Sequence, residues 1–146
     1  MSEVSAGIVG ALLGAFVAGV ITFWIQRRRE QREAKAARVI VELELDEAAE
    51  VVRAIERSKG WPPGWMRAWS QSWATNRPAL ALDMPDRSFK KLADAYLFMG
   101  RLEAGLAAGQ RPLVESDEPF LTEGSARLEP ARAVVWTRRR GWFERG

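Results

Sequence analysis

Few residues in this 146-residue chain could do chemistry, because it contains no Cys and no His. It therefore has no thiolate nucleophile, no imidazole base, and neither of the side chains that most often bind transition metals. The sequence also has no phosphate-binding GxxxxGK(S/T) loop, no dinucleotide-binding GxGxxG motif and no serine in a nucleophile elbow. These absences predict a protein that is not an enzyme and uses no cofactor.

Carboxylates and a single tyrosine are the remaining candidates for chemistry. Five carboxylates fall close together, at Glu42, Glu44, Asp46, Glu47 and Glu50. They could coordinate a hard cation if side chains four residues apart converged, but such residues more often form the solvated face of a charged helix. Tyr96 lies on an apolar helical stripe, which favours a packed core residue over a catalytic acid. Neither feature predicts a catalytic or metal site.

The N-terminal segment has the composition of a membrane-spanning helix. Residues 4–25 are 22 positions without a charge. Such a helix is about 33 Å long, enough for a hydrocarbon core of about 30 Å. A cleaved signal peptide would start with basic residues, whereas Glu3 is the only charge before this segment and arginines follow it. We expect residues 4–25 to span a bilayer.

Basic residues after the apolar segment predict its orientation. No basic residue precedes the segment, and six follow within 13 positions of Ile25. These six are Arg27, Arg28, Arg29, Arg32, Lys35 and Arg38. Because Lys and Arg beside a span stay in the cytoplasm, we expect residues 1–3 outside a bacterial plasma membrane and the remaining domain inside. Trp24 suits the headgroup boundary, and the arginines could also contact anionic lipid.

One face of the predicted span carries small residues, at Gly7, Gly10, Ala11, Gly14 and Ala18. Larger apolar residues occupy the opposite side. Gly10 and Gly14 on this face form a GxxxG pair, which lets two helix backbones approach closely. Gly and Ala are common in any membrane helix, but their segregation to one face predicts self-association or a partner membrane protein.

The helix is expected to continue past the membrane through residues 26–59. Gln26 to Ser58 contains no Pro and no Gly and is rich in strong helix formers. Its charge is divided: residues 26–38 hold six basic and two acidic residues, whereas residues 39–58 hold two basic and six acidic ones. The basic half lies next to the predicted span, where it could set the topology or contact the cytoplasmic leaflet.

The acidic half carries an apolar seam about two heptads long. Spacings of four, three, four and three residues separate Val41, Leu45, Ala48, Val52 and Ile55. The apolar face is widened by Val39, Ile40, Leu43, Val51 and Ala54. This breadth is typical of one helix in a small bundle. The seam could pack against the chain's own later helices, which we favour, or against a second copy.

Residues 60–110 are predicted to form a Trp-rich short helix and a core helix. Gly and Pro at positions 60–64 end the first helix. Trp65, Trp69 and Trp73 then recur every four residues and could be core, a protein-binding set or an interfacial membrane helix. Core packing is the default, because aromatic stripes mostly bury inside their own domain. Against the membrane option, a straight preceding helix would place these residues about 50 Å from the bilayer.

A linker over residues 76–85 is expected to lead to Asp86 as an N-cap and to a core helix over residues 87–108. Residues 111–146 are predicted to be a loop followed by a basic C-terminal helix or tail. Pro119 and Pro130 could each begin a short helix there. The terminal arginines and tryptophans could contact lipid, but a solvated tail is the commoner outcome, and no nucleic-acid partner is expected.

These elements predict an all-α fold, in which a transmembrane helix continues into a cytoplasmic amphipathic helix followed by a small helical bundle. The span followed by QRRREQREAKAARVIVELE resembles small bacterial single-pass membrane proteins of unassigned function, over residues 1–58. The same region is distantly similar to the peripheral-stalk b subunit of ATP synthase. The helix break at residues 61–64 departs from that subunit, so its function is not carried over.

The leading functional hypothesis is a membrane-anchored interaction, scaffold or accessory-subunit protein. An alternative is a bilayer-active, holin-like oligomer of single spans, which would cause leakage and would not need its cytoplasmic domain. An enzyme that obtains its missing chemistry from a partner or cofactor is a third and weaker reading, because the usual catalytic groups are absent.

Overall fold

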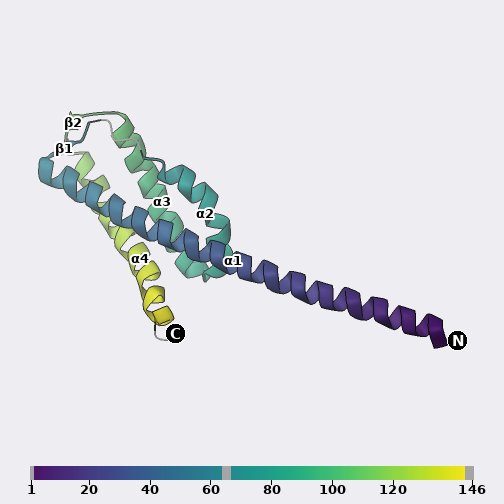
Figure 1. Ribbon diagram of the computed structural model, residues 1–146. Coiled ribbons are helices and arrows are strands. Elements are labelled where there is room, and N and C mark those ends of the chain that lie inside the picture. Colours follow the sequence, from purple (N-terminus) through teal and green to yellow (C-terminus); the bar gives the residue numbers. More distant parts are fainter. Residues whose placement is uncertain (1, 64–66, 144–146) are drawn as a thin grey trace.

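The computed structural model describes residues 2–63 and 67–143, and the side chains of residues 14–63 and 67–136. The described elements follow the order α1 (Ser2–Ser58), β1 (Gly60–Trp61), α2 (Trp69–Asp83), α3 (Asp86–Ala107), β2 (Arg111–Pro112) and α4 (Asp117–Phe143). The C-terminal half of α1 packs with α2, α3 and α4, and its N-terminal half projects beyond them (Figure 1). The predicted all-α fold with a helical bundle is confirmed.

The predicted membrane segment lies in the projecting half of α1. Within the described part of the chain, no helix holds a stretch that is long and apolar enough to cross a membrane. Residues 4–13 of the predicted segment lie outside the residues whose side chains are described, and so do Gly7, Gly10 and Ala11. The backbone is helical through the whole segment, from Ser2 onward.

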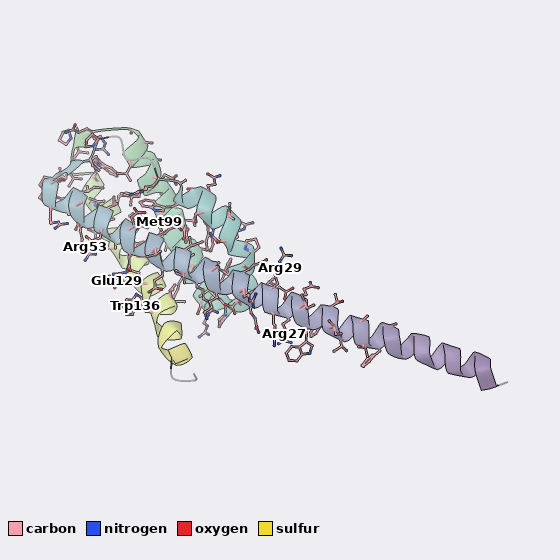
Figure 2. All side chains as sticks on the ribbon, in the orientation of Figure 1. Arg27, Arg29, Arg53, Met99, Glu129 and Trp136 are labelled. Atoms are coloured by element: carbon pink, nitrogen blue, oxygen red, sulfur yellow. The ribbon has the colours of Figure 1, made fainter. Side chains whose placement is uncertain are left out.

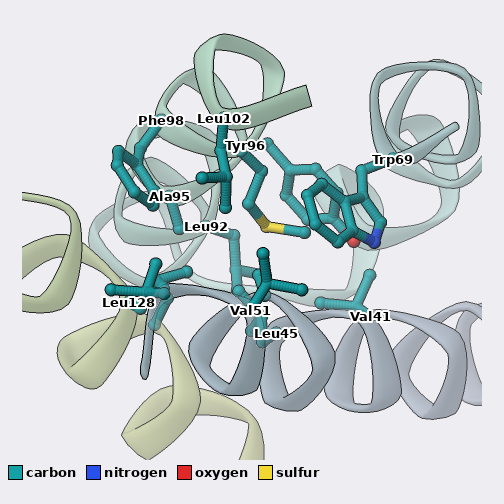
Figure 3. Packing of buried hydrophobic residues seen from close by; sticks show 14 of the residues in the cluster. Val41, Leu45, Val51, Trp69, Leu92, Ala95, Tyr96, Phe98, Leu102 and Leu128 are labelled. Atoms are coloured by element: carbon teal, nitrogen blue, oxygen red, sulfur yellow. The ribbon is translucent and has the colours of Figure 1, made fainter. Parts of the chain in front are cut away.

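The apolar seam of α1 packs against the chain's own helices. Its five residues, Val41, Leu45, Ala48, Val52 and Ile55, are at most 1% exposed. Figure 3 shows Val41 and Leu45 of α1 directed into the same core as Trp69 of α2 and Leu92 of α3. The seam therefore packs against later helices of the same chain, which is the alternative that the sequence favoured. A seam between two copies is wrong, because α2, α3 and α4 cover it.

The expected widening of this seam is correct on one side and wrong on the other. Val51 is buried, whereas Val39, Ile40 and Leu43 are 53%, 40% and 64% exposed. Val39 and Leu43 are each two residues from Val41, which places them on the side of α1 that faces away from the core, and Ile40 lies at the flank between the two sides. α1 therefore has a covered apolar face and an uncovered one.

The expected linker over residues 76–85 is wrong, because α2 continues through Pro78 to Asp83. An interior Pro removes one helical hydrogen bond and costs about 3 kcal/mol. Beyond it, Leu80 is fully buried in the core, and Arg38 of α1 forms an ion pair with Asp83. These tertiary contacts offset the local cost. Asp86 is also not an N-cap: it is the first residue of α3, and the capping position is Pro85, which makes no side-chain cap bond.

The C-terminal region forms one helix where a loop and short helices were expected. α4 runs from Asp117 to Phe143, with Pro130 in its interior. Four of its residues at helical spacing, Leu121, Leu128, Ala131 and Val135, are buried. The burial of Ala131 and Val135 just beyond Pro130 supports the helix at the point where its local hydrogen bonding is weakened. Residues 113–116, between β2 and α4, are a short connection whose Leu113 packs against the core.

A two-stranded ribbon closes the end of the bundle that lies farthest from the projecting helix. Trp61 pairs with Arg111 in antiparallel β1 and β2, and its side chain is only 3% exposed. The Trp61 indole N–H donates to the Asp117 carboxylate at 3.2 Å, and Arg111 donates to the same carboxylate at 2.6 and 2.9 Å. This Arg111 guanidinium holds the pKa of Asp117 well below its usual range. Trp61 therefore anchors the ribbon to the start of α4.

Candidate interaction surface

The acidic cluster of α1 makes contacts between helices. Among the described residues, no group of three His, Cys, Asp or Glu side chains could hold a metal ion. Glu44 accepts a hydrogen bond from the Tyr96 hydroxyl, and Glu47 accepts one from the Trp69 indole N–H at 3.1 Å. Asp46 pairs with Arg132 of α4 at 2.7 Å. These carboxylates therefore fix α2, α3 and α4 to α1.

The buried phenol of Tyr96 gives a specific spectroscopic prediction. Burial, together with the hydrogen bond to Glu44, raises the pKa of Tyr96 far above its usual value of 10.0. The folded chain keeps this proton at a pH where the unfolded chain releases it, so the contribution of Tyr96 to stability is full below about pH 10 and falls above it. Because Tyr96 is the only tyrosine, tyrosinate absorbance should appear only as alkali unfolds the bundle.

The measurement is a parallel alkaline titration of tyrosinate absorbance and circular dichroism. Tyr96→Phe is the control, and its melting temperature should decline less steeply above pH 10 than that of the parent chain. Appearance of tyrosinate near pH 10 with the helical signal intact would contradict the buried, carboxylate-bonded phenol.

The predicted tryptophan stripe does not form a surface. Trp69 is 2% exposed, and Trp73 is half-buried, stacked on Tyr96 with ring centroids 4.5 Å apart. Trp65 lies outside the described residues. Where it is described, this stripe is therefore core.

Trp24 and the arginines after it do lie on the surface. Trp24 is 60% exposed, with the Arg28 guanidinium 5.7 Å from its ring centroid, and the Arg27 guanidinium lies 5.9 Å from the Phe23 ring centroid. Figure 2 shows Arg27 and Arg29 where α1 leaves the bundle. These side chains form a belt of aromatic and basic groups around α1 at the base of its projecting half.

The described part of the projecting half of α1 exposes its large apolar side chains to the surroundings. Phe16 is 71% exposed and Ile25 is 64% exposed. Between them, Val17, Val20, Ile21 and Phe23 are 41% to 60% exposed. Exposed apolar surfaces of this kind are typical of sites that contact a membrane or another protein.

One face of α1 runs away from the bundle along both halves of the helix. We call it the outward face, and its described members are Gly14, Ala18, Ile25, Arg32, Ala36, Val39 and Leu43. Spacings of three, four and seven residues keep these positions on one side of a helix. The buried residues Ala34, Ala37 and Val41 lie on the other side, against the bundle. The small positions of the predicted span and the exposed apolar positions after it therefore share one face.

A groove of about 620 Å³ separates the base of the projecting helix from the end of α2. The α1 wall includes Phe23, Arg27 and Glu30, and the α2 wall includes Pro78 and Leu82. The groove places the C-terminal end of α2 beside the aromatic and basic belt. This neighbourhood could not be predicted from the sequence, because the local pattern of residues 76–85 is that of a linker.

Comparison with models of protein families, with curated proteins and with solved structures finds no match to this chain.

Proposed function

We propose that this chain is a membrane-anchored interaction protein. Residues 4–25 span a bacterial plasma membrane with the N-terminus outside, and the outward face of α1 packs against a second copy of the same helix. The observation that carries this proposal is the outward face itself, whose exposed apolar residues Val39 and Leu43 continue the line of Gly14 and Ala18.

The anchoring part of the proposal rests on length, charge and exposure. Residues 4–25 carry no charge and are long enough for a hydrocarbon core of about 30 Å. The side chains from Phe16 to Ile25 lie in no protein core. Trp24 and the arginines that follow suit a headgroup boundary on the cytoplasmic side.

The self-association part rests on where the bundle lies. Since α2 and α4 pack on the opposite side of α1, and α3 packs on α2 and α4, a second helix can lie along the outward face without meeting them. At Gly14, an added Cβ would find no atom within 4 Å, so nothing in this chain occupies the space beside it. Small residues at such positions allow two backbones to approach closely within a membrane.

The test compares two glycines of the projecting helix. An added Cβ would meet no atom within 4 Å at either Gly14 or Gly19. Gly19 follows Gly14 by five residues, however, so it lies on the side of the helix that faces the bundle. In the full chain in detergent, Gly14→Leu should weaken association at least tenfold, whereas Gly19→Leu should leave it unchanged. Light scattering over a range of protein-to-detergent ratios measures the association, and circular dichroism checks that both variants fold.

A second matched pair tests the outward face beyond the span. Leu43 of α1 and Leu97 of α3 are 64% and 63% exposed. Leu43→Glu should weaken association, and Leu97→Glu should not, because Leu97 lies on another helix. A chain that stays monomeric at every ratio would overturn self-association, and one that fails to float with lipid vesicles would overturn the anchor.

A further inference from the structure

The bundle has a basic end, and it is the end from which the projecting helix emerges. We call it the near end, and it consists of the C-terminal part of α2, the α2–α3 turn and the first turns of α3 (Figure 1). Residues 77–91 carry four basic residues, Arg77, Arg87, Lys90 and Lys91, all of them exposed. Of the two acidic residues in this range, Asp83 pairs with Arg38. The near end therefore adds basic charge beside the arginines of α1.

The opposite end of the bundle carries charges of both signs. Residues 115–123, which lead into α4, carry four acidic residues, but Arg57, Lys59 and Arg111 lie at the same end. The end that faces the predicted membrane surface is therefore the one whose turn, between α2 and α3, is mainly basic.

The near end lies close to the level where the bilayer would end. Ala34 is the first described residue of α1 to be buried, and it follows Ile25 by nine residues, or about 14 Å of helix. A headgroup layer occupies about 5–8 Å of that distance. The remainder is comparable to the screening length of about 8 Å at physiological salt, and long Lys and Arg side chains shorten it further.

An apolar residue lies at the tip of this basic end. Leu82 is 84% exposed, the most exposed of the large hydrophobic residues whose side chains are described. Its position on the groove wall opposite Phe23 and Arg27 brings it to the aromatic and basic belt of α1. An apolar tip among basic residues is typical of segments that enter the headgroup region of an anionic membrane.

We propose that the near end of the bundle rests on anionic phospholipid, with Leu82 in the headgroup region and Arg77, Arg87, Lys90 and Lys91 against lipid phosphates. This inference rests on the proposed anchor, since the span brings the near end to the membrane. The bundle then contacts the bilayer at two places, the span and the α2–α3 turn. Two contacts fix the orientation of the bundle relative to the membrane, whereas the span alone would leave the bundle free to reorient.

The experiment places a reporter at Leu82 in the full chain. Because the chain has no Cys, Leu82→Cys gives one labelling position for an environment-sensitive fluorophore. In vesicles of equal parts phosphatidylglycerol and phosphatidylcholine, its emission should shift to the blue, and pure phosphatidylcholine should give a clearly smaller shift. Val114→Cys is the matched control, 47% exposed at the opposite end, and should keep a solvent-like emission in both.

Charge reversal and vesicle flotation complete the test. Lys90→Glu with Lys91→Glu should abolish the Leu82 shift, and an unchanged shift would overturn the proposal. A chain that floats with vesicles while its Leu82 probe stays solvent-like would overturn the docking and leave the anchor standing. A chain that does not float would overturn the anchor instead. A shift that needs an added acidic protein in place of anionic lipid would also overturn the proposal.

Discussion

Gly124→Ala is expected to destabilise the bundle by about 2–3 kcal/mol, the cost of over-packing a filled core. A Cβ built at Gly124 would lie 2.0 Å from the Phe98 Cζ and 2.2 Å from its Cε2. The Phe98 ring cannot easily turn away, because it is 3% exposed and packs on Phe120 with centroids 4.9 Å apart. The substitution must therefore push α4 away from α3. Thermal unfolding of the full chain in detergent should show a midpoint lowered by roughly 5–10 °C.

The matched control for this prediction is the neighbouring exposed position. Ser125→Ala changes the same helix with no core contact and should leave the midpoint nearly unchanged. Phe98→Leu combined with Gly124→Ala should cost less than the sum of the two single changes, because the smaller side chain makes room for the new methyl group. Strict additivity of the two changes would argue against a direct clash.

Leu45→Ala is expected to cost about 3 kcal/mol, whereas Leu43→Ala should cost less than about 0.5 kcal/mol. The two leucines lie two residues apart on α1, yet Leu45 is fully buried and Leu43 is 64% exposed. Removing the Leu45 side chain leaves a cavity among Val41, Trp69 and Leu92, which the other helices can close only in part. Removing the Leu43 side chain leaves the bundle intact.

The measurement is thermal unfolding followed by the near-ultraviolet circular dichroism of the tryptophans, at a protein-to-detergent ratio where the chain is monomeric. Working with monomers keeps any loss of association by Leu43→Ala out of the comparison. Equal destabilisation by the two changes, or a larger effect of Leu43→Ala, would show that the covered and uncovered faces of α1 are assigned the wrong way round.

Local chemistry was sufficient for the first helix and its end. Gln26 to Ser58 lacks Pro and Gly, and Gly60, Pro62 and Pro63 follow directly, so α1 ends at Ser58 as expected. The seam residues were also predictable, because a repeat of three and four residues places side chains on one helix face wherever that helix is found. Both features depend only on neighbours in sequence.

Continuity of the later helices depended on distant contacts. Pro78 and Pro130 each carry a local cost that favours a break, and the expected linker and short helices followed from that cost. In the fold, α2 and α4 pass through these residues because Leu80, Ala131 and Val135 are buried against other helices. Packing energy from residues far along the chain is not visible in a local pattern.

By itself, the sequence determined that the second half of α1 carries a broad set of apolar residues around one seam, that its charges are divided, and that residues 4–25 carry no charge. Only the tertiary structure decided which face is covered, since Val41 and Val39 are equally apolar and differ only in where α2, α3 and α4 lie. It also gathered Leu82 and the basic residues of α2 and α3 beside the projecting helix. The physical reason is the same in both cases: helix faces are set by local periodicity, whereas their partners are set by packing between distant segments.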